Sequence, residues 1–163
     1  MSTLIPTGAY AKTEDVPGYL GYLKGHMAVF PAYFNGMTEE RRLDRKATGK
    51  WTRQEILGHL VDSAINNLVR FTRTPLSPSP YVIQSYPQVE LVVVNRYQEL
   101  PAGHLVTLWE DLNRQIFFVI EGLTPAQLAL PVETRDGSLP SLGWLFCDYV
   151  AHLEHHLRQI YTD

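Results

Sequence analysis

The amino-acid sequence predicts an all-α protein that folds as one four-helix bundle domain over residues 1–163. Apolar residues recur at helical spacing in four long segments, helix-capping motifs precede some of these segments, and no strand-like stretch has an evident partner. A chain of this length suits one domain with one core. Four long amphipathic helices bury their apolar faces against one another, and here a long crossover would separate the second from the third.

The first helix is expected after an irregular arm at residues 1–12. Thr13 can cap it, and Asn35 and Gly36 close it. Pro31 predicts a kink or an early end, because proline lacks the backbone N–H that the helix needs. The apolar residues at helical spacing are Tyr19, Leu20, Leu23, Met27, Phe30 and Phe34.

The second helix has the clearest start in the chain. Thr52 and Glu55 match a capping box, in which each side chain bonds the other residue's backbone N–H. Trp51 and Ile56 occupy the two positions of a hydrophobic staple around the same start. We expect this helix to run to about Thr72, where a nearby proline stops it.

A long loop is predicted for residues 74–90, which hold four prolines, three serines and two tyrosines. A loop of this length inside a compact domain is usually functional. Residues 91–99 are ambiguous. Their propensity favours a strand, but a single strand would have no partner, so we expect a short helix or an extended cover.

A third helix follows Pro101, and a short one follows it. Thr124 and Gln127 form a second capping box with proline at the first helical position, which predicts a helix start there. The apolar stripe of the third helix consists of Leu105, Leu108, Leu112, Val119 and Ile120.

The last helix begins after Ser138 or Ser141, either of which can cap it, and runs to about Tyr161. At about 100° per residue, one stripe of this helix is apolar. The stripe consists of Leu142, Phe146, Tyr149, Leu153, Leu157 and Ile160.

Two histidines of this helix, His152 and His156, stand four residues apart. Positions i and i+4 lie one turn apart on one helix face, so the two imidazoles can share a metal ion. Both fall at the border of the apolar stripe, whereas His155 lies on the polar flank. A third nitrogen would complete an open site with water in the remaining position. The alternative is that both histidines bond only to neighbours or to water.

The second helix carries a polar row opposite its apolar stripe, and this row includes His59. The row is either a solvated face or the border of a polar pocket in which His59 is a metal ligand, and periodicity alone does not decide. The capping box already accounts for one member, Glu55. The full row is Glu55, His59, Asp62, Ser63, Asn66 and Arg70.

Four further features bear on the site, and three of them have two interpretations each. Asp148 is either a hydrogen-bond acceptor for His152 or a surface carboxylate. Arg70 either binds an anionic group of a substrate or forms a surface ion pair. Cys147 projects away from the two histidines, which argues against a catalytic thiol. The remaining feature is a set of three tyrosines, Tyr81, Tyr86 and Tyr97. They either line the mouth of a site or pack their rings on the protein with the hydroxyl in contact with water.

Composition excludes several classes of protein. The formal net charge is -3 and lysine and arginine do not cluster, which argues against a nucleic-acid partner. The single cysteine excludes an internal disulfide and a thiolate-rich zinc site. No apolar run is long enough to span a bilayer, and the N-terminus lacks the pattern of a signal peptide. We therefore expect a cytoplasmic protein without a membrane partner.

Two segments resemble the signature helices of the DinB-like (YfiT-like) superfamily. The first is Trp51-Thr-Arg-Gln-Glu-Ile-Leu-Gly-His59-Leu-Val-Asp62-Ser63. The second is Leu142-Gly-Trp144-Leu-Phe-Cys-Asp148-Tyr149-Val-Ala-His152-Leu-Glu-His155-His156-Leu-Arg-Gln159-Ile160. The resemblance implies an up-down-down-up four-helix bundle in which three histidines hold one divalent metal ion. Matched by position, the ligands would be His59, His152 and His156.

The resemblance also implies a chemistry. The family includes thiol-dependent S-transferases and thiol-dependent isomerases, so we expect a metal-dependent transferase or hydrolase acting on a small molecule. Zinc or nickel would be the metal, and a low-molecular-weight thiol a possible cosubstrate. Metal-bound water or thiol would be the nucleophile, with the substrate held under residues 74–99. A homodimer is also implied. The alternative is a non-catalytic bundle that binds a small ligand or a partner.

Overall fold

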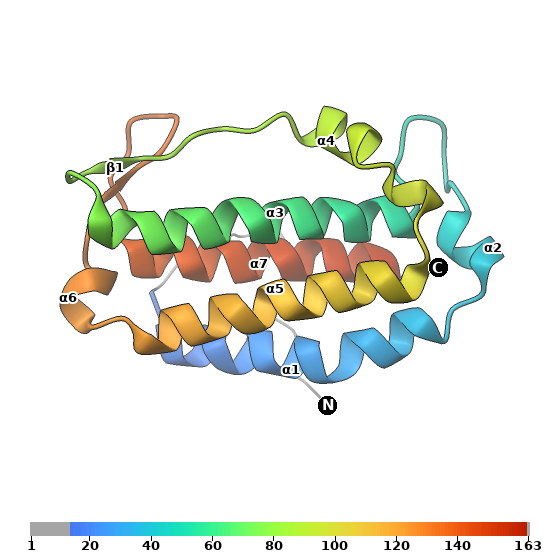
Figure 1. The fold of residues 1–163 in the computed structure, drawn as a ribbon, viewed down its shortest axis with the longest axis horizontal. Coiled ribbons are helices and arrows are strands. Elements are labelled where there is room, and N and C mark those ends of the chain that lie inside the picture. The colour runs from blue at the N-terminus through green and yellow to red at the C-terminus, as the bar shows by residue number, and fades with distance from the viewer. Residues whose placement is uncertain (1–13, 163) are drawn as a thin grey trace.

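The computed structural model describes residues 14–162 and confirms the all-α class, with long helices that lie lengthwise in a bundle (Figure 1). The predicted arm at residues 1–12 and the predicted cap Thr13 lie outside the described residues. The four long helices are α1 (Val16–Asn35), α3 (Arg53–Arg73), α5 (Ala102–Gly122) and α7 (Leu142–Tyr161). Shorter helices are α2 (Glu39–Leu43) and α6 (Pro125–Leu128), of which α2 was not predicted.

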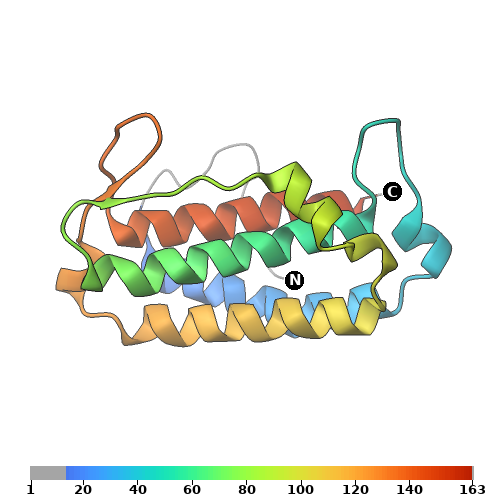
Figure 2. The same cartoon turned by 45° about the horizontal axis from the view of Figure 1, so that its top comes forward.

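The helices run up, down, down and up, as the family resemblance implied. In Figure 1, α1 and α7 run in one direction and α3 and α5 in the other. Helix α3 packs against α5 and α7, and α1 packs against the same two helices. Because α3 and α5 are parallel, the chain must return along the whole bundle between them. Residues 74–101, the crossing segment, make this return along α3 in both ribbon views (Figures 1 and 2).

The crossing segment contains more structure than the loop expected at residues 74–90. It holds a 3-10 turn at Thr74–Leu76, strand β1 (Tyr81–Val82), helix α4 (Gln88–Val94) and a second 3-10 turn at Tyr97–Glu99. For residues 91–99 the structure therefore confirms the helical alternative over the strand.

Strand β1 pairs in parallel with β2 (Val132–Glu133), with Tyr81 opposite Val132. The backbone N–H of Ile83 donates to the carbonyl of Glu133 at 2.9 Å. Sequence patterning missed this pairing because each strand has two residues and the partners are far apart in the chain. The pairing ties the crossing segment to the loop that precedes α7.

The observed cap of helix α1 lies two residues after the predicted cap, Thr13. Asp15 caps the helix, accepting a hydrogen bond from the N–H of Gly18 at 3.1 Å. Of the kink or early end expected at Pro31, the early end does not occur. The helix ends at Asn35 with Gly36 as its C-cap, where the sequence predicted that it would close. Phe30 and Phe34 are both fully buried on either side of this proline, and their packing holds the turn together despite the missing donor.

The predicted helix starts are otherwise confirmed. Both capping boxes form, Thr52 with Glu55 before α3 and Thr124 with Gln127 before α6. Of the two possible caps for α7, Ser141 is the one used, accepting from the N–H of Trp144 at 2.9 Å.

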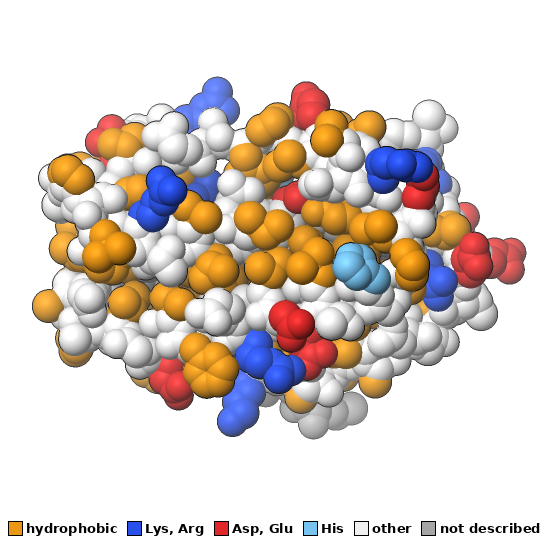
Figure 3. Space-filling model, viewed as in Figure 1, with side chains coloured by type: hydrophobic (Ala, Val, Ile, Leu, Met, Phe, Trp, Pro, Cys, Tyr) orange, Lys and Arg blue, Asp and Glu red, His pale blue; other side chains and the backbone are white. Residues whose placement is uncertain are grey.

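The core lies between the four long helices. Trp109 of α5 is its largest fully buried side chain, and its ring centroid lies 4.9 Å from that of Phe30. Every member of the predicted α7 stripe is buried. Figure 3 shows apolar side chains that also gather on the outer face, and the exposed ones on α3, α4 and α5 are Ile65, Val69, Val89, Val93, Val94 and Phe118.

Candidate metal centre

The structure brings together three histidines, His59 from α3 and His152 and His156 from α7, here called the histidine trio. Each offers one ring nitrogen, and these nitrogens all lie within 4.8 Å of one another. Nε2 of His59 lies 3.4 Å from Nε2 of His152. His155 is outside this group, with its Nε2 at 3.1 Å from Nε2 of Gln159. The helical faces therefore separate the neighbouring histidines as the sequence predicted.

The spacing of the trio fits a small divalent ion. A tetrahedral ion with nitrogen ligands at about 2.0–2.1 Å holds any two of them about 3.4 Å apart. The 3.4 Å between the Nε2 atoms of His59 and His152 matches this value. The whole set spans no more than 4.8 Å, which side-chain rotation can close.

Burial keeps the trio neutral. Desolvation, together with the smaller effect of nearby histidines, lowers the pKa of His59 to about 4 and that of His152 to about 3. Desolvation also lowers the pKa of His156 against an opposing hydrogen bond with Gln159. Neutral imidazole is the form that binds a metal, so the site is ready for a ligand role over the ordinary pH range.

Neighbouring side chains orient two of the rings. Nδ1 of His156 lies 2.9 Å from Oε1 of Gln159, which places the proton on Nδ1 and leaves Nε2 for a metal. The ring of Trp51 lies against that of His59, with centroids 4.9 Å apart. Within residues 14–162, Nδ1 of His59 is buried and has no hydrogen-bond partner.

The polar row on α3 borders an interior site and is not a solvated face, because His59, Asp62 and Ser63 are all buried. Oδ1 of Asp62 accepts a hydrogen bond from the hydroxyl of Tyr97 at 2.7 Å and one from Nδ2 of Asn95 at 3.0 Å. Burial raises the pKa of Asp62, and these two hydrogen bonds oppose the increase. Asp62 thus holds the crossing segment beside the trio.

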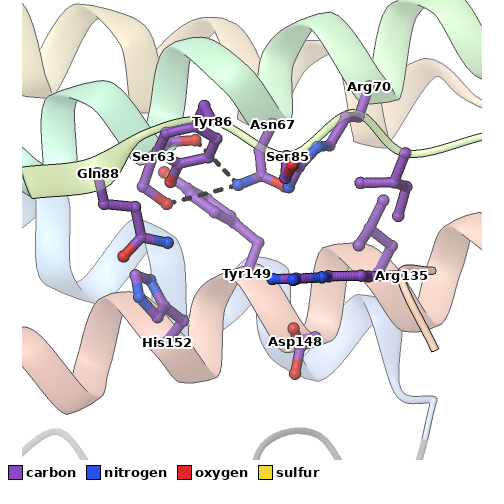
Figure 4. A pocket seen from close by; sticks show the side chains of 12 residues that line it. Ser63, Asn67, Arg70, Ser85, Tyr86, Gln88, Arg135, Asp148, Tyr149 and His152 are labelled. Carbon is purple, nitrogen blue, oxygen red and sulfur yellow. Dashed lines mark hydrogen bonds between the residues drawn. The ribbon is translucent and has the colours of Figure 1, made fainter. Parts of the chain in front are cut away.

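A cavity of about 340 Å³ opens beside His152 (Figure 4). Arg70 of α3 and Arg135 of the loop after β2 both line it, and we call it the arginine pocket. Its other lining residues are Ser63, Asn67, Ile83, Ser85, Tyr86, Gln88, Leu145, Asp148, Tyr149 and His152.

A second cavity of about 690 Å³ opens beside His156. Trp51, Ile56 and Val89 contribute its apolar wall, and we call it the tryptophan pocket. The trio therefore contributes one histidine to the arginine pocket and another to the tryptophan pocket.

Several sequence hypotheses are settled by these positions. Asp148 is half-buried in the arginine pocket, but no hydrogen bond joins it to His152 among the residues described. Burial raises the pKa of Asp148 to about 6, with Arg70 opposing. Arg70 forms no surface ion pair there, and instead donates to the carbonyl of Gln84 at 3.0 Å. Burial raises the pKa of Cys147 to about 11, which agrees with an unreactive thiol.

The three tyrosines divide between the two expected roles. Tyr86 lines the arginine pocket, whereas Tyr97 is buried against Asp62. Tyr81 belongs to β1 and is half-buried against the core. Sequence reasoning missed Arg135, because it stands in a turn near Gly137 that carries no periodic signal.

Fold and site together define a helical bundle with a cluster of three histidines that could hold a metal ion. The chain belongs to the DinB superfamily. The sequence model of that superfamily matches residues 22–160. Within the described part of the chain, no helix combines the length and apolar character that crossing a membrane requires.

Two relatives carry the name "Putative metal-dependent hydrolase". One, from Oceanobacillus iheyensis, is 26% identical over 69% of this chain, which spans 64% of that protein, less than two thirds of its length. The other, from Geobacillus thermodenitrificans, is 25% identical over 93% of this chain and 85% of that protein.

Two solved structures share the fold. YfiT from Bacillus subtilis, described as a probable metal-dependent hydrolase with an unusual four-helix bundle topology, superposes with a TM-score of 0.81 at 21% identity, covering 96% of this chain and 89% of that one. A mycothiol-dependent maleylpyruvate isomerase superposes with a TM-score of 0.67 at 12% identity, covering 88% of this chain and 60% of that one.

Proposed function

We propose that this protein is a metal-dependent enzyme in which His59, His152 and His156 hold one divalent ion. The observation that carries the proposal is the convergence of three neutral imidazoles from two helices at a point bordered by two cavities. A buried histidine that serves only packing does not need two further imidazoles beside it. A metal ion in an open site does need three such ligands, with one position left free. The names of the two relatives agree with metal dependence.

No carboxylate or thiolate belongs to the trio, and imidazole ligands suit zinc, nickel, iron and copper alike. We propose zinc or nickel as the bound ion. When bound, such an ion lowers the pKa of a coordinated water or thiol and so supplies a nucleophile near neutral pH. The three histidines position that nucleophile. Asp62 and Tyr97 keep the crossing segment over the same place, which limits the access of bulk water.

Two pockets favour a reaction between two organic substrates. A hydrolase needs a single organic substrate and water, whereas an S-transferase needs a thiol and an electrophile. The tryptophan pocket beside His156 is the larger, and the arginine pocket beside His152 is the more polar. The thiol-dependent neighbour adds support for a thiol cosubstrate. We therefore place thiol transfer ahead of hydrolysis.

Metal analysis of purified variants tests the centre. We expect close to one equivalent of zinc or nickel in the wild type, and less than a tenth of that in His59→Ala, His152→Ala and His156→Ala. His155→Ala is the matched control, because it removes a neighbouring imidazole that lies outside the trio. Near-stoichiometric metal in all three trio variants would contradict the assignment, and loss in His155→Ala would show that a different pair binds.

Turnover assays separate an enzyme from a binding protein. Zinc- and nickel-loaded protein is incubated with small thiols plus a chromogenic electrophile, and with ester and amide panels, against metal-free protein as the control. We expect metal-dependent turnover in the thiol panel. Ligands found by thermal shift without any turnover would instead identify a non-catalytic binding bundle. Light scattering on the same samples tests the predicted homodimer.

A further inference from the structure

The arginine pocket holds more positive than negative charge. Arg70 and Arg135 come from different elements, yet both side chains lie along the cavity that His152 lines (Figure 4). Asp148 is the one carboxylate among the lining residues. Within residues 14–162, neither guanidinium forms a salt bridge. With all three groups ionised, the pocket has one unneutralised positive charge beside the histidine trio.

Arg70 is held in place with donors to spare. It donates to Oδ1 of Asn67 at 3.3 Å and to the carbonyl of Gln84 at 3.0 Å, and it lies over the ring of Tyr86 at 5.8 Å. Asn67 is buried and is itself bonded to the carbonyl of Ser63 at 2.9 Å. A guanidinium has five N–H donors, so these two bonds leave others for a ligand.

Arg135 is brought to the pocket by tertiary structure. It follows β2, whose pairing with β1 places this loop beside the crossing segment. Asp136 stabilises the loop by accepting a hydrogen bond from the N–H of Ser138 at 3.1 Å. Arg135 is exposed, and no hydrogen bond of its side chain is found in the described structure. Its guanidinium is therefore available to a ligand.

We propose that the arginine pocket binds a carboxylate group of the substrate, a suggestion that rests on the proposed function of the trio. A planar carboxylate matches the fork of a guanidinium and accepts two parallel hydrogen bonds from it. The cavity of about 340 Å³ suits a small organic acid. With its carboxylate between Arg70 and Arg135, such a molecule would direct its remainder toward His152. The substrate class is thus a small carboxylic acid.

Binding of benzoate and benzamide tests the proposal, because the two probes share a shape and differ in charge. Each is titrated into zinc-loaded and metal-free protein and followed by calorimetry. We expect benzoate to bind at least tenfold more tightly than benzamide in both forms. Arg135→Met should reduce this preference to less than twofold without affecting the fold, because the side chain is exposed.

Arg73→Met is the matched control. Arg73 lies one turn from Arg70 on α3, is exposed and is not among the lining residues, so the substitution removes the same charge outside the pocket. It should keep the full preference. Arg70→Met should lose the preference for benzoate. Arg70→Lys retains the positive charge, and it is the control for an effect of Arg70→Met that comes only from loosening of the crossing segment. Asp148→Asn should strengthen benzoate binding about threefold, because it removes a like charge.

The outcomes also separate the two proposals. Equal binding of both probes to the metal-free wild type would overturn the carboxylate pocket. A preference that needs zinc and survives Arg135→Met would overturn it too, because the carboxylate would then be binding the ion. A preference that persists in His59→Ala and depends on Arg135 would support the pocket even if the metal proposal fails.

Discussion

Helices α1 and α5 bury mainly apolar side chains, apart from His26 and Asn113. Helices α3 and α7 bury aromatic rings too, but they also bury a larger set of imidazole, amide and carboxyl groups. Between α1 and α5, in what we call the aromatic region, the ring of Phe30 packs against those of Phe34 and Trp109. The buried polar residues of α3 and α7 include His59, Asp62, Ser63, Asn67 and Glu154. Aromatic burial is favourable by itself, but a buried polar group is unfavourable unless it has a partner. Helices α3 and α7, the polar region of the bundle, therefore hold groups whose presence stability alone does not explain.

The crossing segment supplies hydrogen-bond partners for some of these buried polar groups. Nε2 of Gln54 donates to the carbonyls of Tyr97 and Leu100, each at 2.9 Å, and the hydroxyl of Tyr97 donates to Asp62. The ring of Tyr97 also packs directly on Gly58, where a Cβ atom would lie 2.2 Å from it. Helix α3 thus contacts the crossing segment with hydrogen-bonding groups. It contacts α7 through the histidine trio and through Phe71, which packs against Phe146 and Tyr149.

The largest expected effect lies in the aromatic region. Trp109→Ala should lower the free energy of unfolding by about 3–5 kcal/mol, because it removes the largest buried side chain and leaves a cavity. Urea denaturation measures the change. The folded variant should keep the metal content of the wild type. A parallel loss of metal under native conditions would show that the two regions are not independent.

Acidification should destabilise the metal-free protein through the polar region. The unfolded chain protonates its histidines near pH 6.5, whereas folded His59 and His152 stay neutral until about pH 4 and about pH 3. The unfolded state then binds more protons, so stability falls as the pH decreases from about 6.5 toward 4. We expect a loss on the order of 3 kcal/mol by pH 5.

Urea denaturation at several pH values measures this slope. His26, whose pKa burial lowers to about 4, contributes to the slope from α1. The double variant His59→Leu/His152→Leu should therefore flatten the profile without abolishing it. An unchanged profile in that variant would show that the trio is not the source.

A glycine pair tests the packing of the crossing segment on α3. Gly58→Ala should cost about 1–3 kcal/mol, because the new methyl group overlaps the Tyr97 ring. Gly21→Ala is the control on α1, where nothing lies within 4 Å, and it should be neutral or stabilising by about 0.5–1 kcal/mol. Thermal unfolding compares the two. Equal effects would mean that Tyr97 does not pack closely in solution.

The smallest expected effect is the difference in stability cost between variants of the two capping boxes. Thr52→Ala should cost about 1–2 kcal/mol, because the hydroxyl of Thr52 caps α3 and also bonds Oε1 of Gln98 at 2.7 Å. Thr124→Ala should cost about 0.5 kcal/mol, since it caps only the short, exposed α6. Thermal unfolding of both variants is again sufficient. A larger cost for Thr124→Ala than for Thr52→Ala would contradict the inference that the hydrogen bond between Thr52 and Gln98 adds to the stability of the α3 cap.

Helical periodicity is a local property, and local features were predicted from the sequence. The spacing of His152 and His156 determined that they share a face, and it separated them from His155. Capping motifs located the starts of α3 and α6. Pro31 shows the limit of this reasoning, because local chemistry left open a kink or an early end there, whereas the helix continues past it between the buried Phe30 and Phe34.

The sequence by itself determined the all-α class, the helix faces and the shared face of His152 and His156, because each depends on neighbours within a few residues. His59 joined these two as a candidate ligand through the family resemblance. Only the tertiary structure decided that the polar row of α3 is buried, since that depends on where the crossing segment lies. It also decided that Arg135 joins Arg70, because a two-residue strand pairing brings together loops that are about fifty residues apart in the chain. Long-range contacts leave no periodic trace in sequence, and both pockets are built from them.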